Sequence, residues 1–538
     1  MRDNRQLSFW SLRFNRPQGA VLLGFCVFSV ALLLRILLAL QPGLWADEIF
    51  SLAMATGHSL EHPAAEANPT CGDFVEPGPP QSPTVFHKYM QHESPPAGPG
   101  RVIRAVLLSD TSPPVYYLIL NLWTRVAGTD DAALRLFSTL WAMACFPLLW
   151  ALGRQIGGKE TAWVACVLFV LSPPALYYSA EGRMYSLVWF LALSLAWTSF
   201  ALYSQGPRLL LLLLWILSAA AGLLTHYFFA FVLMACLLWL WFHPGSISRI
   251  YQVGAAIVAG LIALPWYLRL PESLSSWRVT AGWLEHPLSW KQALTAPFSL
   301  AYSFLSGYGI WGGWKCMAVG LAGLFALLIV TTLRQGVGRL VTERLQLLWL
   351  WGIAACVGPV VFDLLRSTSA SLVERYALPG LPAGLLLAAV AIRRLHRTAC
   401  IVCLLLILVA WLPGIRDSFT NPSRAWEPFP EVGASITAWA SPDDLIIVHS
   451  IPSGVLGVAR YLGADVSIAS WVVQLKRRRV PDDLKELTAN RPRVALVKVH
   501  DLGEPSPAET WLRENARLDR RDIMHNSTKI LYFSLTIN

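Results

Sequence analysis

Long apolar runs recur along most of the chain, from near the N-terminus to about residue 414. A helix needs about 20 apolar residues to cross the roughly 30 Å hydrocarbon core of a bilayer. Eleven runs approach that length, and a shorter run at 114–127 is predicted to form a re-entrant or interfacial helix. The eleven predicted spans are 18–41, 131–153, 161–178, 184–204, 209–224, 227–243, 251–270, 309–333, 344–363, 376–392 and 398–414.

The composition leads to the same conclusion. Hydrophobic residues make up 55% of the chain and charged residues only 14%, whereas a soluble domain averages about 25% charged residues. The formal net charge is +10, but Lys and Arg form short clusters between the apolar runs and do not gather on one basic face. This pattern is typical of membrane topology, so the bilayer is an expected partner and nucleic acid is not.

The basic clusters also predict the orientation, because cytoplasmic loops carry an excess of Lys and Arg. They assign residues 1–17 to a cytoplasmic N-terminus and 18–414 to a transmembrane domain, in a multi-pass protein of the plasma (inner) membrane. The extracytoplasmic side then receives the long loop 42–130 and the tail 415–538. The Pro- and Gly-rich middle of that loop, residues 63–100, is expected to be flexible.

The tail differs in composition from the rest of the chain. Runs rich in β-formers alternate in it with polar, helix-like segments, which predicts a small soluble α/β domain. The expected strands are 444–450, 493–499 and 530–534, and the expected helices are 431–440, 481–489 and 507–515.

Polar residues stand at the extracytoplasmic ends of several spans. Asp47 and Glu48 directly follow the first span, and two carboxylates at a membrane surface are costly unless water, a cation or a reaction uses them. They suit a general base or a divalent cation site, but also a solvated pair that caps an interfacial helix. Arg35 lies inside the first span and requires a buried partner.

Two further clusters each have an ordinary structural alternative. Asp110 precedes an apolar helix that contains Tyr117, and it could simply cap that helix. Glu181 and Arg183 form the tip of a hairpin between two spans, with Tyr185 just beyond. They could form a loose ion pair, or the guanidinium could bind a phosphate.

His226 at a helix–helix turn and Arg375 at the start of a span lie on the same side. The histidine could be structural, or could bind a phosphate or, with Asp47 and Glu48, a metal ion. Arg375 could contact a phosphate or extend to the interface. Acids and guanidinium groups on one lipid-adjacent side suit a substrate that carries a phosphate on a lipid tail.

The segments that contain these residues resemble motifs of the GT-C fold glycosyltransferases, in the branch of the protein O-mannosyltransferases and lipid A aminoarabinose transferases. The matching stretches are WADE, PPVYYL, YYSAEGRMYSL, THY and ERYALPGLP, within roughly residues 18–415. YYSAEGRMYSL is the most specific of them. Ser112 stands where the family pattern has His or Lys, which leaves Asp110 as the residue that could replace that contact.

The resemblance implies a GT-C-type helical fold and a polyprenyl-phosphate sugar as donor, with an acceptor that the sequence does not identify. It makes Asp47 the general base, with Glu48 in support of it or of a divalent cation, and Glu181 the second acid. It assigns Arg183 and Arg375 to the donor phosphate. The remaining substrate-binding candidates are Asp110, Tyr117, Tyr185 and His226. The alternatives are a transporter or flippase of lipid-linked sugars and a catalytically inactive relative.

Overall fold

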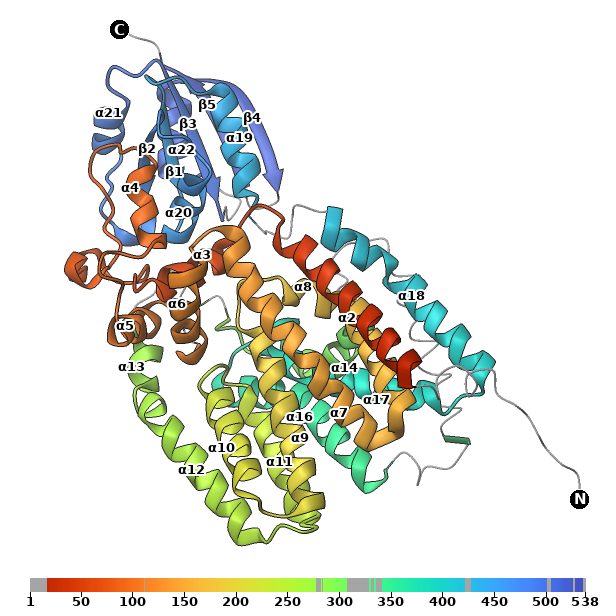
Figure 1. The fold of residues 1–538 in the computed structure, drawn as a ribbon. Coiled ribbons are helices and arrows are strands. Elements are labelled where there is room, and N and C mark those ends of the chain that lie inside the picture. The colour runs from red at the N-terminus through yellow and green to blue at the C-terminus, as the bar shows by residue number, and fades with distance from the viewer. Residues whose placement is uncertain are drawn as a thin grey trace, which may run out of the picture.

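In the computed structural model the apolar runs form a bundle of helices, and a sheet domain lies beyond one end of the bundle (Figure 1). The structure describes all residues except 1–16, 111, 277–281, 283, 307–328, 330–332, 335–340, 421–426, 501–504, 526–527 and 536–538. Nearly all of the predicted cytoplasmic N-terminus 1–17 and most of the predicted span 309–333 therefore lie outside the described residues.

Within the described residues, six helical segments are long and apolar enough to cross a membrane. They are α7 (Asp131–Leu171), α9 (Tyr185–Gln205), α12 (Arg249–Leu268) with α13 (Leu270–Ser275), α16 (Glu343–Arg366), the 3-10 segment Glu374–Gly380 with α17 (Leu381–Arg393), and α18 (Arg397–Thr420). Three shorter apolar stretches are Gly24–Ala39 within α2 (Pro17–Ala39), α10 (Leu209–Leu223) and α11 (Phe229–Phe242). The predicted polytopic helical fold is confirmed, whereas the number of eleven spans is not established.

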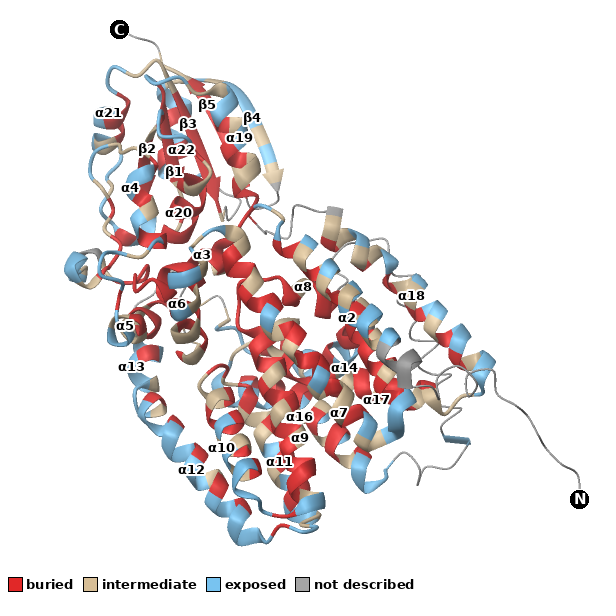
Figure 2. Ribbon diagram, in the orientation of Figure 1, coloured by how far each residue is buried: buried red, intermediate tan, exposed pale blue. Residues whose placement is uncertain are grey.

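The bundle carries apolar side chains on its outside. Figure 2 shows exposed residues along α12 and α18, and among them are Leu261, Leu264, Leu405 and Val409. Apolar surface of this extent is costly in water and matches the environment of a lipid chain.

The backbone departs from a regular helix at two points, one within α7 and one at its C-terminal end. Within α7, Gly158 has φ 85° and ψ 177°, a backbone conformation that glycine adopts without strain. The predicted span 161–178 ends at Leu171, because Ser172 is extended before Pro173 and a separate helix, α8 (Pro173–Ser179), follows. The hydroxyl of Ser179 accepts a hydrogen bond from Arg35 (3.0 Å), which is the buried partner that Arg35 requires.

Helix α14 (Trp290–Ser306) lies between the predicted spans 251–270 and 309–333, where no helix was predicted, and packs against α16 and α17. Lys291, Gln292 and Pro297 interrupt its apolar pattern, which explains why hydropathy alone did not mark it.

The long loop 42–130 is folded. It contains α3 (Ala46–Ala55), α4 (Thr84–His87), α5 (Pro99–Ser109) and α6 (Val115–Ala127), the last at the run predicted to form a short helix. The middle, expected to be flexible, instead packs against the tail. Gln81 forms an antiparallel bridge with Ile468, and the Glu76 carboxylate accepts hydrogen bonds from Ser470 Oγ and Val472 N (both 2.8 Å).

The tail forms a five-stranded sheet in the order β2-β1-β3-β5-β4. Its strands are β1 (Leu445–His449), β2 (Ser467–Trp471), β3 (Arg493–Val499), β4 (Arg517–His525) and β5 (Thr528–Ser534), of which the first three are parallel and β5 is antiparallel to β3 and β4. Its helices are α19 (Phe429–Trp439), α20 (Pro452–Arg460), α21 (Asp482–Thr488) and α22 (Pro507–Asn515). The predicted C-terminal α/β domain is confirmed.

Candidate functional site

Helix α3 brings the first two acids to the end of the bundle that faces the sheet domain (Figure 1). Both lie in its first turn, where the helix dipole favours negative charge. Glu48 is almost fully buried, with 1% of the residue exposed. Its carboxylate accepts hydrogen bonds from Arg135 Nε (2.9 Å), Arg135 Nη2 (2.7 Å) and the Gly182 backbone N–H (2.7 Å). Glu48 is therefore committed to a buried ion pair that joins α3 to α7.

Asp47, its neighbour, has a different environment. Its side chain is 26% exposed, and Oδ2 lies 2.8 Å from Arg375 Nη1 and 4.0 Å from Arg183 Nε. The Arg375 guanidinium also lies over the ring of Trp45, at 5.8 Å from the ring centroid. One carboxylate thus meets two guanidinium groups from distant parts of the chain.

Arg183 is fixed by a second set of contacts. Its Nη1 lies within hydrogen-bond distance of Asp110 Oδ2 (3.2 Å), Tyr117 Oη (3.2 Å) and Ser51 Oγ (3.3 Å). Tyr117 in turn donates to Asp110 Oδ2 (2.5 Å). Charge-assisted bonds of this kind hold the guanidinium in one orientation. Asp110 does not cap α6, whose N-cap residue is Pro114; it follows α5 and helps to orient Arg183.

Glu181 makes no ion pair with any residue that the structure describes. The residue is 5% exposed, and its Oε2 is buried with no hydrogen-bond partner. Burial, with a smaller contribution from the negative charge of Glu48, raises the pKa of the Glu181 carboxyl to about 8. At neutral pH Glu181 is therefore mostly protonated and can donate a hydrogen bond, unlike Asp47.

The raised pKa predicts that Glu181 makes the fold less stable as the pH rises. Below about pH 4.5 the carboxyl is protonated in both the folded and the unfolded protein. Between pH 4.5 and pH 8 the folded protein keeps this proton and the unfolded protein loses it. The free energy of unfolding should fall across this window, by at most about 5 kcal/mol. Thermal unfolding in detergent at pH 5 and pH 8 should show a smaller decrease for Glu181→Gln than for the wild type. Glu66→Gln, an exposed loop position, should follow the wild type.

His226 belongs to an aromatic group beside the charged cluster. Its ring centroid lies 6.2 Å from those of Tyr185 and Tyr376. Burial, together with the charge of Arg183, lowers the pKa of His226 to about 4, and its Nδ1 has no hydrogen-bond partner. The imidazole is neutral at physiological pH, so one ring nitrogen can donate a hydrogen bond and the other can accept one, while the side chain adds no charge.

The structure brings Asp47, Asp110, Tyr117, Arg183 and Arg375 into one contact network. Glu181, Tyr185 and His226 lie around the network and share no hydrogen bond with it among the contacts of the described residues. Asp47, Glu48 and His226, named as possible metal ligands, do not form one group, since the described part of the chain has no group of three or more His, Cys, Asp or Glu side chains that could hold an ion.

Sequence reasoning missed Arg135 and the link to the tail. Arg135 lies inside a predicted span, and a charged residue there signals a buried partner. The tail residue Glu427 accepts a hydrogen bond from Ala46 N (3.0 Å) at the start of α3, and its other oxygen lies 2.9 Å from His500 Nε2. Tyr461 Oη contacts both Leu44 N and Asp131 Oδ2 (2.7 Å each). No motif marks these tail positions.

The fold and the cluster define a polytopic membrane protein with an acid–guanidinium site at one end of its helical bundle. The fold is that of ArnT, which confirms the predicted GT-C-type fold. Residues 111–268 match the model of the family described as dolichyl-phosphate-mannose-protein mannosyltransferase. That segment includes Glu181 and Arg183 but not Asp47 or Arg375.

Two solved structures cover almost the whole chain. ArnT from Cupriavidus metallidurans in the apo state aligns with a TM-score of 0.57 and 14% identity, over 96% of this chain and 98% of ArnT. The same protein bound to undecaprenyl phosphate aligns with a TM-score of 0.57 and 13% identity, over the same shares. At this identity the likeness establishes a common fold. No curated protein sequence matches the chain significantly.

Proposed function

We propose that this chain is a glycosyltransferase that moves a sugar from a polyprenyl-phosphate donor to a hydroxyl group of a lipid, glycan or protein acceptor. The observation that carries the proposal is the pair of guanidinium groups, Arg183 and Arg375, that meet at the carboxylate of Asp47. Two such groups in a partly buried site suit a phosphate, which accepts bidentate hydrogen bonds from arginine.

The ion pairs of Asp47 suggest how binding of the donor makes its carboxylate available as the general base. Without substrate, Arg375 pairs with Asp47 at 2.8 Å. A bound phosphate group competes for both guanidinium groups, which leaves the Asp47 carboxylate free to accept a proton from the acceptor. Glu48 is unsuited to this step, because its oxygens already accept hydrogen bonds from Arg135 and Gly182.

The reaction is a single displacement. Asp47 takes the proton of the acceptor hydroxyl, the acceptor oxygen forms a bond to the anomeric carbon, and the bond from that carbon to the phosphate oxygen breaks. Polyprenyl phosphate leaves with its added negative charge stabilised by Arg183 and Arg375. Asp110 and Tyr117 orient Arg183. Protonated Glu181 is a hydrogen-bond donor for the sugar or the phosphate. Tyr185 and His226 line the same side of the site as Glu181.

Two further observations support the donor and the side of the membrane. ArnT, which has the same fold, has been crystallised with undecaprenyl phosphate, so this fold accommodates a phosphate on a polyprenyl chain. The Lys and Arg clusters favour a cytoplasmic location for the opposite ends of the spans, so the site would face the extracytoplasmic side of the plasma membrane.

The test is a transfer assay in membranes that contain the wild-type protein and a panel of radiolabelled polyprenyl-phosphate hexoses and pentoses. We expect label to move from the lipid phosphate to an acceptor, with inversion of the anomeric configuration, because one displacement inverts the reacting carbon. Retention would contradict direct attack assisted by Asp47. Donor that crosses the bilayer of proteoliposomes without being consumed would favour a transporter, and donor that binds without either outcome would indicate an inactive relative.

A further inference from the structure

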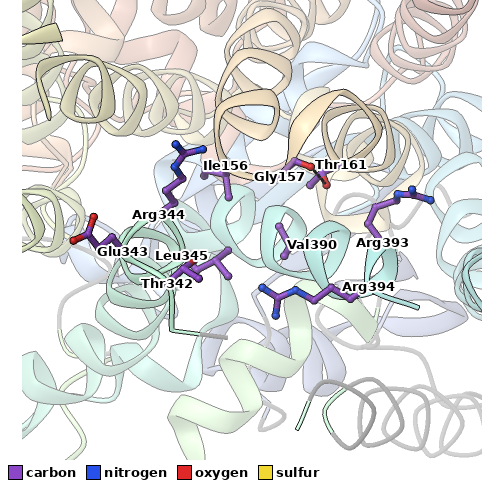
Figure 3. Close-up of a pocket in the computed structure, with 10 residues that line it drawn as sticks. All are labelled: Ile156, Gly157, Thr161, Thr342, Glu343, Arg344, Leu345, Val390, Arg393 and Arg394. Atoms are coloured by element: carbon purple, nitrogen blue, oxygen red, sulfur yellow. Dashed lines mark hydrogen bonds between the residues drawn. The ribbon is translucent and has the colours of Figure 1, made fainter. Parts of the chain in front are cut away.

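A pocket of about 520 Å³ lies at the other end of the bundle from Asp47, between α7, α16 and α17 (Figure 3). Helix α16 begins at the pocket and runs for 24 residues, about 36 Å, toward the acid–guanidinium site. The pocket forms beside the interruption of α7 at Gly158, and its neighbour Gly157 lines the wall. It is therefore separate from the proposed transferase site.

Three arginines, Arg344, Arg393 and Arg394, line this pocket. Arg344 donates a hydrogen bond to the backbone carbonyl of Gln155 (3.0 Å), and Arg393 pairs with Glu160. Figure 3 shows that Arg394 extends from α17 toward the Thr342 end of the pocket. Because Arg393 is paired with Glu160, the positive charge of the lining comes from Arg344 at the start of α16 and from Arg394 directly after α17.

The acidic residue of the lining does not neutralise this charge. Glu343 directs its carboxylate to the hydroxyl of Tyr203 (2.7 Å), and Figure 3 shows it pointing away from the other lining residues. The rest of the wall is apolar, with Leu345, Val390 and Ile156, except for the hydroxyl groups of Thr161 and Thr342. An anion with an adjoining apolar part is the complementary ligand.

We infer that this pocket binds a phosphate group, carried by an anionic phospholipid headgroup or free in solution. Arginine is suited to bidentate contact with phosphate oxygens, and basic pockets between transmembrane helices are typical sites for anionic headgroups. The apolar wall, contributed by helices long enough to span a membrane, favours the lipid. The site is independent of the proposed transferase reaction and is tested without it.

The experiment uses the full-length protein in nanodiscs of phosphatidylcholine, with or without phosphatidylglycerol, and measures the thermal unfolding midpoint and the lipid retained in native mass spectrometry. In the wild type, phosphatidylglycerol should raise the midpoint and remain bound. Retention should fall about tenfold for each of Arg344→Gln and Arg394→Gln. Arg208→Gln is the matched control, because Arg208 is exposed at the same end of the bundle but outside the pocket.

Inorganic phosphate added to phosphatidylcholine nanodiscs distinguishes the two sources. Stabilisation by phosphatidylglycerol alone identifies a lipid headgroup, and stabilisation by inorganic phosphate that needs Arg344 and Arg394 identifies a free anion. Val390→Trp, which fills the pocket and keeps its charges, should abolish either effect even if the glutamine variants fold poorly. An equal response of the wild type, Arg208→Gln and the pocket variants would overturn the inference, because diffuse surface charge would then explain it.

Discussion

Asparagine at position 47 is expected to lower sugar transfer by about 10²- to 10⁴-fold, the usual contribution of a positioned general base. Asn keeps the shape of Asp47 but has no oxygen basic enough to take the acceptor proton. Donor binding should be retained or become tighter, because the phosphate no longer competes with the Asp47 carboxylate that pairs with Arg375 at 2.8 Å. The measurement is the initial rate of label transfer together with the dissociation constant for the labelled donor.

The matched control is Asp465→Asn, which makes the same substitution at an exposed position of the C-terminal domain. It should transfer sugar at the wild-type rate. If Asp47→Asn lost donor binding and transfer in equal proportion, Asp47 would be an organising residue for the two guanidinium groups and not the base. If it kept full transfer, another residue would have to accept the proton, and the proposed mechanism would fail.

The positions at the ends of the spans could be predicted because their chemistry is visible in the sequence. An acid or arginine beside an apolar run stands out, and the charge bias of the loops places such residues on one side. Asp47, Arg183 and Arg375 were found in this way, and they are in contact although 328 residues separate the first from the last. Their catalytic roles stay a prediction.

Distances within the cluster could not be predicted from the sequence. They show that the two neighbouring acids, Asp47 and Glu48, have different environments. Asp47 and Glu48 are equivalent by sequence pattern, yet one is 26% exposed and the other is buried against Arg135. The difference arises from the rotation of α3, which directs Glu48 toward α7. Such a rotation depends on tertiary packing, including the bond from Ala46 N to Glu427 of the tail.

The tail illustrates a second limit. Strands β1, β3 and β5 are apolar and were predicted, whereas β4 (Arg517–His525) is rich in Arg and Asp and does not look like a strand. It forms one edge of the sheet, where charged side chains protect the unpaired backbone. The other edge strand, β2, is met by Gln81 of the long loop. Edge strands are defined by their neighbours, which hydropathy along the chain does not reveal.

Replacement of Arg135 by leucine should produce the largest loss of stability among these variants, about 3–5 kcal/mol, because it leaves a buried carboxylate without its cation. Both partners are almost inaccessible, with side chains 2% and 1% exposed. Arg135 also donates to the backbone carbonyls of Gln41 (2.6 Å) and Gly43, which lead into α3. Thermal unfolding in detergent should show a strongly lowered midpoint, whereas Arg269→Leu, at an exposed ion pair, should change it little.

The double variant Arg135→Leu with Glu48→Gln separates charge from packing. If the uncompensated carboxylate causes the loss, the double variant should regain a large part of the stability, and the two substitutions should be strongly non-additive. If the stability losses of the two single variants simply added up in the double variant, the unpaired charge of Glu48 would not be the cause of the loss in Arg135→Leu. Restored transfer in the double variant would further support a structural role for Glu48. Glutamine at position 48 can still accept the hydrogen bond from Gly182 N through its amide oxygen, and Asp47 remains as the base.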